Sequence, residues 1–343
     1  MGNKKTAAVI MAGGAGERLR PITETMPKPL VPVGNTPVIE SSLCVLRRLG
    51  VGEVTVTVRY LGDMIRDTYG DDYGGMKIKY HYEKGQRGTA GSTADALRGT
   101  DAGEIIVLSG DSLTDMSPAS ALEMHRKSGG DATLILTRSE EPWRYGVVSV
   151  DFAGRIKSFR EKPDGERPGA LINTGMYILS PSVLGLIPTA GEYDFGHDLF
   201  PSLAKRGGIY GLVGRGYWCD IGSPESYLKG CFDAASGCVA GMEAVVGEYG
   251  AIMAEDCRAG DHTVLDGCVL HRGVTAGDHV NARDSVFCSG VSVGSGVSIG
   301  RGCVIGSDTV IGDGVSVPND TMIPSGSVIM TSEAAEKMQI PAP

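Results

Sequence analysis

A glycine-rich segment near the start of the chain has the residue types of a phosphate-binding loop. It reads Ala12-Gly13-Gly14-Ala15-Gly16-Glu17-Arg18-Leu19 and directly follows the apolar run 7–11. Glycines let backbone N–H groups approach phosphate oxygens closely, and an arginine can pair with two such oxygens at once. These glycines and Arg18 are therefore the first candidates for holding a polyanion.

Two familiar nucleotide-binding loops do not match this segment. Leu19 stands where the dinucleotide-binding fingerprint has its third glycine, and the chain contains no G-K-[ST] sequence of a Walker A loop. The chain continues instead into Pro27-Lys28-Pro29-Leu30, in which Lys28 lies between two prolines. By themselves, the prolines are also compatible with a stiff surface loop and a solvated lysine.

Together, the two segments resemble the signature of a known enzyme family. The pattern G-G-x-G-x-R-L-x-P…P-K-P-L is similar to that of the sugar-1-phosphate nucleotidyltransferases, also called nucleotide-sugar pyrophosphorylases. Six further segments resemble motifs of this family in the family's order: Gly88-Thr89-Ala90-Gly91, Gly110-Asp111, Tyr145-Gly146-Val147, Glu161-Lys162-Pro163, Asn173-Thr174-Gly175 and Gly216-Tyr217-Trp218-Cys219-Asp220-Ile221-Gly222. The resemblance covers residues 7 to about 230. It implies that a nucleoside triphosphate reacts with a sugar 1-phosphate to give a nucleotide sugar and pyrophosphate.

The resemblance also implies a role for individual residues. The implied catalytic residues are Arg18, Lys28, Asp111, Lys162 and Asp220. Among them, the two aspartates hold Mg²⁺, the arginine and Lys28 pair with the triphosphate, and Lys162 pairs with the sugar phosphate. The nucleotide is expected to contact Ala12, Gly13, Gly14, Gly16, Arg18, Lys28, Gly88, Thr89 and Asp111. The sugar phosphate is expected to contact Gly146, Glu161, Lys162, Asn173 and Thr174.

This reaction needs charge neutralisation more than it needs a general base. A phosphate monoester has its second pKa near about 6, so the attacking group is already largely dianionic at neutral pH. Positioning and fixed positive charge supply most of the catalysis in phosphoryl transfer. Mg²⁺ prefers hard oxygen ligands, and aspartates and phosphates provide them.

Several functions remain open from the sequence. The motifs look most like those of bacterial mannose-1-phosphate guanylyltransferases, which implies GTP and mannose 1-phosphate as substrates and GDP-mannose as product. The alternatives are a glucose-1-phosphate thymidylyl- or uridylyltransferase and a non-catalytic regulatory homologue. A regulatory homologue would be expected to lack some of the five implied catalytic residues, and all five are present. An acyltransferase would need a histidine of the second half of the chain as its base: His262, His271 or His279.

The elements that must position these residues read as an α/β domain. Short Val- and Ile-rich runs alternate with helical segments between residues 7 and 180, which predicts a Rossmann-like, mainly parallel sheet. We predict strands over Ala7–Met11, Glu53–Val58, Glu104–Leu108 and Ala132–Leu136, with antiparallel additions over 147–151, 155–159 and 171–179. The glycine-rich loop then follows the carboxyl end of a strand, where such sheets place their ligands.

The second half of the chain follows a different period. Val293, Ile299, Ile305, Ile311, Val317, Ile323 and Ile329 recur every six residues, and glycine or proline follows each of the first six. The spacing resembles the hexapeptide repeats of left-handed parallel β-helices. Ser223-Pro224 is expected to open a connecting helix that ends near Ala235. We therefore predict a nucleotidyltransferase domain over residues 1–235 and a β-helix over residues 236–343.

Charge and composition limit the partners. The formal net charge is −9, which argues against nucleic acid or an anionic membrane as a partner. No apolar run approaches the roughly 18 residues that would suggest a membrane span, so we expect the protein in the cytoplasm. The eight cysteines include no C-x-x-C pair, which gives no indication of a zinc site. The flat faces and open ends of a β-helix favour assembly into a homo-oligomer.

Overall fold

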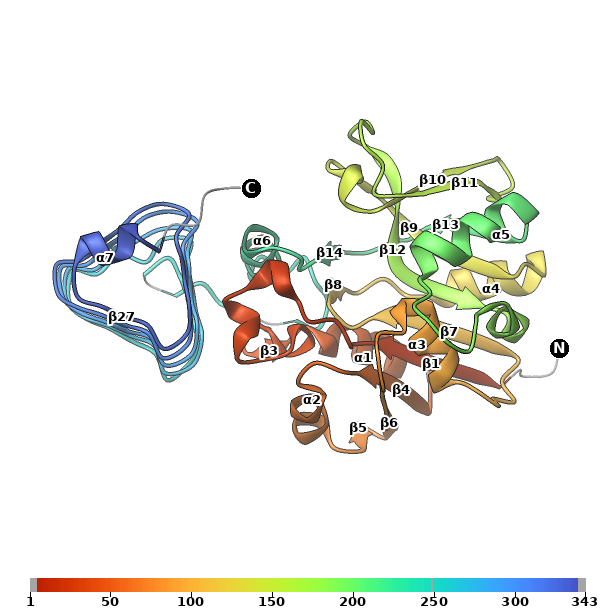
Figure 1. Cartoon of the computed structure of the whole chain (residues 1–343), viewed down its shortest axis with the longest axis horizontal. Coiled ribbons are helices and arrows are strands. Elements are labelled where there is room, and N and C mark those ends of the chain that lie inside the picture. Colours follow the sequence, from red (N-terminus) through yellow and green to blue (C-terminus); the bar gives the residue numbers. More distant parts are fainter. Residues whose placement is uncertain (1–4, 243, 248, 339–343) are drawn as a thin grey trace. The chain divides into compact units, whose positions relative to one another are not determined.

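The computed structural model describes residues 5–242, 244–247 and 249–338 (Figure 1). Its contacts divide the chain into two compact units. Unit 1 comprises the chain up to Gly14 and residues Ser41–Trp218, and unit 2 comprises Ala15–Glu40 and the chain from Cys219 onward. The predicted sequence domains, 1–235 and 236–343, divide the chain differently and stay a prediction.

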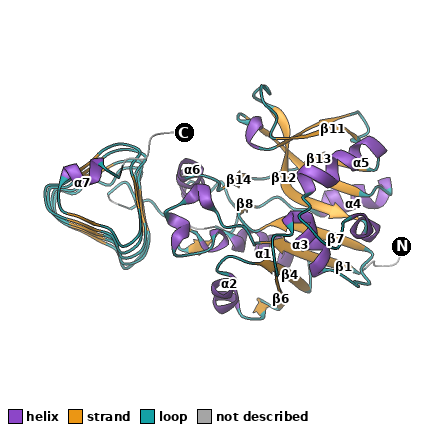
Figure 2. Ribbon diagram, viewed as in Figure 1, coloured by secondary structure: helices purple, strands orange, loops and turns teal. Residues whose placement is uncertain are grey.

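Unit 1 is built on a ten-stranded mixed sheet (Figure 2). Its main path has the order β11-β10-β12-β7-β1-β4-β6-β5, and β9 pairs with both β12 and β13. The strands are β1 (Thr6–Met11), β4 (Glu53–Val58), β5 (Asp72–Tyr73), β6 (Met76–Tyr82), β7 (Glu104–Ser109), β9 (Ala132–Ser139), β10 (Gly146–Val150), β11 (Ile156–Glu161), β12 (Ala170–Leu179) and β13 (Ile209–Val213). The centre is parallel, because β1 pairs in parallel with both β4 and β7.

The predicted α/β architecture is confirmed. Each of the four predicted strands is present, and β10, β11 and β12 are the predicted antiparallel additions. The remaining elements of this part of the chain are α1 (Ile39–Arg48), α2 (Gly62–Tyr69), α3 (Gly88–Ala96), β8 (Ser112–Thr114), α4 (Ala119–Ser128), η4 (Pro142–Arg144), η5 (Pro181–Leu186), η6 (Phe195–Leu199), α5 (Phe200–Arg206) and β14 (Trp218–Asp220). Phe195 and Phe200 stack in the apolar core with the inner residues of β7, β9 and β12.

Unit 2 contains a proline-rich segment (Ala15–Glu40), the connecting helix and the β-helix. The proline-rich segment includes η1 (Glu17–Leu19), η2 (Ile22–Glu24), η3 (Lys28–Leu30), β2 (Pro32–Val33) and β3 (Thr36–Pro37). Helix α6 (Pro224–Ala235) begins at the predicted residue, because the Ser223 side chain accepts from the backbone of Ser226 and forms a capping box. No helix in the described part of the chain is both long and apolar enough to cross a bilayer.

The hexad repeat forms a three-sided β-helix, as expected for the left-handed hexapeptide fold. Its two-residue strands are β15 (Ile252–Met253), β16 (Arg258–Ala259), β17 (Val269–Leu270), β18 (Thr275–Ala276), β19 (Asn281–Ala282), β20 (Val286–Phe287), β21 (Ser292–Val293), β22 (Ser298–Ile299), β23 (Val304–Ile305), β24 (Val310–Ile311), β25 (Ser316–Val317), β26 (Met322–Ile323) and β27 (Val328–Ile329). They stack in parallel as β15-β17-β20-β23-β26, β16-β18-β21-β24-β27 and β19-β22-β25, and the described part ends with α7 (Ser332–Glu336). Figure 1 shows the coils as nested triangles.

The irregular start of the repeat has a simple structural cause. Equivalent residues of the early coils are 17 positions apart, as with Asp261 and Asp278, whereas those of later coils are 18 apart, as with Ser295 and Asp313. The inward positions stay in register all the same: Leu270 lies beside Phe287, and Phe287 beside Ile305. One residue fewer per coil therefore breaks the period of six without breaking the stack.

Candidate functional site

The glycine-rich loop leaves strand β1 at the carboxyl edge of the sheet. The N–H of Ala12 donates to the carbonyl of Thr57 at 3.0 Å, which ties the first loop residue to β4. A Cβ at Gly13 would lie 2.4 Å from Oε1 of Glu83, so a larger residue there would displace that carboxylate. The loop backbone therefore lies directly against an acidic side chain.

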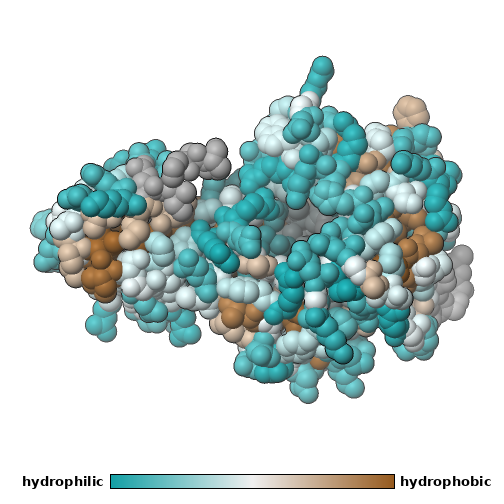
Figure 3. All heavy atoms as spheres, viewed as in Figure 1, coloured by the Kyte–Doolittle hydropathy of each residue, from teal (hydrophilic) through white to brown (hydrophobic). Residues whose placement is uncertain are grey.

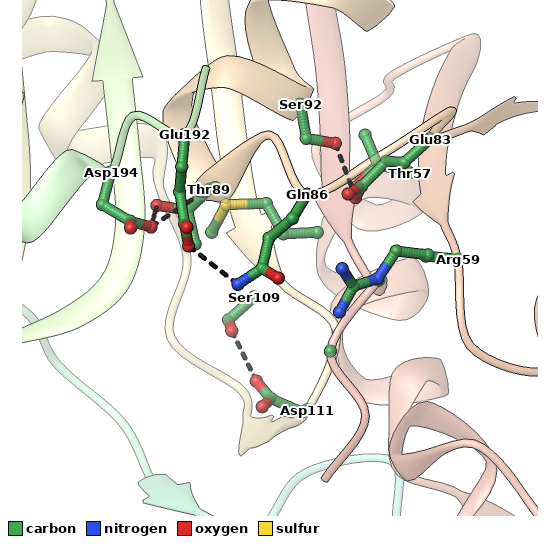
Figure 4. A pocket seen from close by; sticks show the side chains of 14 residues that line it. Thr57, Arg59, Glu83, Gln86, Thr89, Ser92, Ser109, Asp111, Glu192 and Asp194 are labelled. Carbon is green, nitrogen blue, oxygen red and sulfur yellow. Dashed lines mark hydrogen bonds between the residues drawn. The ribbon is translucent and has the colours of Figure 1, made fainter.

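A pocket of about 240 Å³ opens beside this loop in unit 1 (Figure 4). Its lining includes five of the predicted nucleotide-binding residues: Gly13, Gly14, Gly88, Thr89 and Asp111. Residues that the sequence analysis did not select complete it: Met11, Thr57, Arg59, Glu83, Gln86, Ser92, Ser109, Glu192 and Asp194. Figure 4 shows Asp111 and Glu83 at opposite ends of the pocket.

Asp111 is held in place by the turn after β7. Oγ of Ser109 donates to its Oδ1 at 2.5 Å, and the Ser42 hydroxyl donates to the carbonyl of Ser109 at 2.9 Å. A Cβ at Gly110 would lie 2.9 Å from Cγ2 of Ile10 and 3.0 Å from the carbonyl oxygen of Met11. The turn therefore packs tightly on β1 and places the carboxylate at the pocket.

The start of helix α3 is not an open anion site. The backbone N–H and the hydroxyl of Thr89 both donate to Oδ1 of Asp194, at 2.9 and 2.8 Å. The next two N–H groups of the helix donate to the carbonyl of Tyr193. Gly88 has φ +69°, and a Cβ there would lie 2.7 Å from the same carbonyl oxygen. The loop from Gly88 is thus shaped by the 193–194 backbone that it packs on.

Glu161 and Lys162 form a second cluster in unit 1. Gly146 is the strand partner of Glu161, and a Cβ at Gly146 or Gly196 would lie 2.8 or 2.4 Å from Oε2 of Glu161. Burial between these glycines raises the pKa of the Glu161 carboxyl, although the neighbouring Lys162 acts in the opposite direction. Lys162 has φ +43°, and its half-exposed ammonium lies 4.0 Å from Oε1 of Glu161. A lysine with left-handed backbone angles is strained, and such backbone strain occurs often at functional sites.

Asn173 and Thr174 use their side chains within the fold. The Thr174 hydroxyl is buried and donates to the carbonyl of Ile135 at 2.8 Å. The Asn173 amide donates to the Tyr177 hydroxyl, and its oxygen accepts from the N–H of Gly175. The carbonyl of Thr174 accepts from the Trp218 indole at 2.8 Å. The structure therefore shows a shaping role for this turn, while its predicted contact with the sugar stays untested.

The remaining predicted residues gather in unit 2. Nζ of Lys28 lies 3.2 Å from Oδ1 of Asp220, and both side chains are largely buried. A Cβ at Gly222 would lie 2.6 Å from the Asp220 carboxylate and 3.3 Å from a terminal nitrogen of Arg18. Two cations and one carboxylate of the predicted site therefore share one small region. Because a buried charge is costly without a partner, the ion pair fixes the lysine side chain.

A sequence signal existed for some of the residues that were missed. Arg59 directly follows the predicted strand Glu53–Val58, and Glu83 directly follows β6. The carboxyl ends of neighbouring parallel strands meet at one edge of the sheet, so residues there are candidates by position alone. Glu83 was not selected from the sequence, because the preceding segment Met76–Tyr82 was not among the predicted strands.

Comparison with known proteins identifies the family. The model of the "Nucleotidyl transferase" family matches residues 7–236. The chain belongs to this family.

Named relatives of this nucleotidyl transferase share a specific description. The "Probable mannose-1-phosphate guanylyltransferase 1" of Oryza sativa subsp. japonica is 35% identical over 289 residues, which cover 78% of this chain and 78% of that protein. The "Mannose-1-phosphate guanylyltransferase" of Mycobacterium tuberculosis is 31% identical over 298 residues, covering 85% of this chain and 82% of that protein. Two fungal relatives are matched over 62% of their own length.

A solved structure shows the same fold. HddC from Yersinia pseudotuberculosis, complexed with GMP-PN, has a TM-score of 0.58 and 28% sequence identity, over 66% of this chain and 98% of that one. The match covers two thirds of the chain, about the share that the family model spans.

The carboxylates of this nucleotidyl transferase fit the way in which its family generally uses a divalent metal. Among the described residues, no group of three or more histidine, cysteine, aspartate or glutamate side chains could hold a metal ion. Mg²⁺ commonly binds proteins through one or two carboxylates and takes its other ligands from phosphates and water. Asp111 and Asp220 are oxygen donors of that kind, each held by hydrogen bonding or ion pairing.

Proposed function

We propose that the protein transfers a guanylyl group from GTP to mannose 1-phosphate, forming GDP-mannose and pyrophosphate. The observation that carries this choice is the carboxylate of Glu83 in the pocket beside the glycine-rich loop. The printed names of the relatives from Oryza sativa and Mycobacterium tuberculosis support the same substrates.

Glu83 offers the chemistry that a guanine base requires. Its Oε1 accepts from the Ser92 hydroxyl at 2.8 Å, which fixes the carboxylate. An ionised carboxylate only accepts hydrogen bonds, and guanine presents adjacent N1–H and N2–H₂ donors on one edge. Uracil and thymine present one N–H between two carbonyl oxygens. A carboxylate would repel these oxygens, because they also carry partial negative charge. Glu83 is therefore our candidate for base selection.

The phosphates are proposed to lie against the backbone of Gly13, Gly14 and Gly16, with the positive charges of Arg18 and Lys28. In our proposal, Asp111 and Asp220 hold Mg²⁺ together with phosphate oxygens, and the metal when bound neutralises charge on the triphosphate. The sugar phosphate oxygen then attacks the α-phosphorus in line, and pyrophosphate leaves with both bonding electrons. No general base is required, because the attacking phosphate is already deprotonated.

The sugar phosphate is proposed to bind at the cluster of Gly146, Glu161 and Lys162. Lys162 supplies a cation for the phosphate, and the ionised carboxylate of Glu161 can accept hydrogen bonds from sugar hydroxyls. The partly buried setting of this carboxyl strengthens such bonds, because less water competes there than at an exposed site. Asn173 and Thr174 shape the neighbouring turn, and we propose that its backbone faces the sugar.

The homo-oligomer predicted from the sequence also stays a proposal. Val310 and Val328 are neighbours on the β24–β27 stack of the β-helix, and both are exposed together with Met330. Figure 3 shows hydrophobic side chains gathered on the surface of the β-helix in this view. We further propose that the enzyme works in the cytoplasm.

The decisive experiment crosses nucleotides with sugars. Purified protein receives GTP, dTTP, UTP, CTP or ATP, each with mannose, glucose or N-acetylglucosamine 1-phosphate, and pyrophosphate release is measured with Mg²⁺. GTP with mannose 1-phosphate should give the highest kcat/KM, and Glu83→Gln should lower the preference for GTP over dTTP by at least about tenfold. A preference for dTTP or UTP would contradict the guanylyl assignment. Absence of pyrophosphate from every pair would favour the regulatory homologue.

A further inference from the structure

One of the three sides of the β-helix has buried residues on its outer surface. In each two-residue strand the second side chain points inward, so the first one points outward. On the stack β19-β22-β25 these outer residues are Asn281, Ser298 and Ser316, and all three are exposed. On the stack β15-β17-β20-β23-β26 they include Val269, Val286 and Val304, which are 2%, 0% and 0% exposed. On the third stack the outer residues Val310 and Val328 are apolar but exposed. Among the described strands, outer residues that are both apolar and buried therefore lie on the β15-β17-β20-β23-β26 side alone, which indicates a contact within the chain.

Hydrogen bonds identify what lies against that side. The corner that follows this stack contacts the proline-rich segment and helix α6 at three coils, all within unit 2. At one coil, Nε2 of His271 lies 2.8 Å from the Tyr227 hydroxyl, which donates to the carbonyl of Pro32 at 2.6 Å. At a later coil, the Ser307 hydroxyl lies 3.0 Å from that of Thr25. At the next, the N–H of Ser325 donates to a carboxylate oxygen of Glu24 at 2.9 Å.

These contacts bracket Lys28. Glu24 and Thr25 are fixed on one side of it and Pro32 on the other, over three coil steps of about 4.8 Å each. Lys28 and Thr23 in turn support the glycine-rich loop: the Thr23 hydroxyl donates to the carbonyl of Gly16 at 2.8 Å. A Cβ at Gly16 would lie 3.1 Å from that of Lys28. The contacts thus run from the β-helix corner through this segment to the loop.

The hydrogen bonds of Tyr227 also fix a tautomer. A carbonyl can only accept, so the single hydroxyl proton of Tyr227 goes to Pro32. Tyr227 must then accept from His271, which carries its proton on Nε2, while the buried Nδ1 has no hydrogen-bond partner in the described structure. His271 is therefore a neutral donor whose one hydrogen bond connects the β-helix to α6 and, through Tyr227, to the proline-rich segment.

We propose that the β-helix is a positioning element for residues 24–32, and that His271, Ser307 and Ser325 act on turnover by holding the segment that bears Lys28. The inference rests on the proposed function of Lys28 at the triphosphate. It assigns the repeat a role within each chain, apart from any assembly. His271, Tyr227, Ser307 and Thr25 are positioning residues, since none is placed in contact with substrate.

The test compares variants of the full-length protein. Tyr227→Phe removes the hydrogen bonds of the hydroxyl to Pro32 and His271. Ser307→Ala removes the bond to Thr25 from the β-helix side. We expect kcat to fall at least about tenfold for Tyr227→Phe and about three- to tenfold for Ser307→Ala, with the KM for sugar 1-phosphate unchanged. The matched control is Ser298→Ala, an exposed serine of the β-helix outside this corner, which should change neither.

Hydrogen–deuterium exchange supplies a readout that does not depend on activity. The N–H groups of Leu30, Val31 and Val38 are bonded within residues 27–38, and in both variants they should exchange at least several-fold faster. Thr25→Val combined with Ser307→Ala should lose no more kcat than either change alone, because both remove one contact.

The outcomes separate the two proposals. A lower melting temperature with normal kcat and normal exchange of residues 27–38 would overturn the positioning role, as would additive losses in the Thr25–Ser307 pair. If the unmodified protein releases no pyrophosphate from any substrate pair, the proposed function fails. The exchange result then still decides whether the β-helix holds the segment.

Discussion

The buried histidine of the β-helix predicts a specific sensitivity to acid. Complete burial lowers the pKa of His271 from its ordinary 6.5 to about 4. The pKa of His271 is therefore lower in the folded protein than in the unfolded chain, which binds the proton more readily. The free energy of unfolding keeps its full value above about pH 6.5 and falls as the pH decreases towards about 4. Protonation would also place an unpaired charge beside Tyr227 in the core.

The magnitude follows from the two pKa values. The shift is about 2.5 pH units, and each unit corresponds to about 1.36 kcal/mol, so about 3 kcal/mol is lost over the whole window. Between pH 7 and pH 5 the unfolded histidine becomes mostly protonated while the folded one stays mostly neutral. This residue alone should therefore lower the free energy of unfolding by about 2 kcal/mol over that interval.

The assay is urea unfolding at pH 7 and pH 5 of the unmodified protein and of His271→Gln, whose amide can still donate to Tyr227. The variant should be less stable at pH 7 and should lose about 2 kcal/mol less between the two pH values. Ser298→Ala, at an exposed residue of the same β-helix that does not titrate, is the control and should lose as much stability between the two pH values as the unmodified protein. Equal losses for His271→Gln and the unmodified protein would refute the burial of a neutral histidine.

Three further predictions concern the proposed substrate sites. Asp111→Asn should lower kcat at least about a hundredfold with an unchanged melting temperature, because charge stabilisation at the phosphates is lost; near-normal pyrophosphate release at saturating Mg²⁺ would contradict it. Lys162→Gln should raise the KM for sugar 1-phosphate far more than that for the nucleotide, and equal rises would place this lysine elsewhere. Glu161→Gln should raise the melting temperature at pH 8 while it lowers activity, because the raised pKa means that burying the ionised carboxylate costs stability. That gain should shrink towards pH 4 as the unmodified residue takes up its proton, and a gain independent of pH would argue against burial as the cause.

Local patterns predicted most of the fold. Strands β1, β4, β7 and β9 could be predicted because each is a short segment of strand length that is rich in apolar or β-branched residues. Strand β6 was not, because its apolar residues alternate with Lys77 and Lys79, as expected near a sheet edge. Because β6 was not predicted, Glu83, the acidic residue that follows it and lies beside the glycine-rich loop, was not selected as a site residue.

Motif resemblance predicted positions better than it predicted the use of each side chain. Asp111 lines the pocket beside the glycine-rich loop, and its role at the metal stays a prediction. Thr174 lies in its motif, yet its hydroxyl is bonded to the carbonyl of Ile135 inside the core. A motif records which residues recur at a place, and a recurrent threonine can serve either the ligand or the turn beside it. Only the hydrogen-bond partner distinguishes these two cases.

The covered side of the β-helix shows where sequence information ends. The hexad spacing predicted the coils from the inward residues, and the outward residues carried a second signal: valine at 269, 286 and 304, against asparagine or serine at 281, 298 and 316. That contrast favours burial of the first of these two sides, although the outward Val310 and Val328 of the third side are exposed. It does not reveal the cover, because the contacting segment lies far away in the chain: Thr25 and Ser307 are 282 positions apart. Contacts at such separation leave no period in the sequence. Here they join the repeat to the segment that bears the proposed phosphate-binding lysine, so the β-helix and this segment belong to one structural unit.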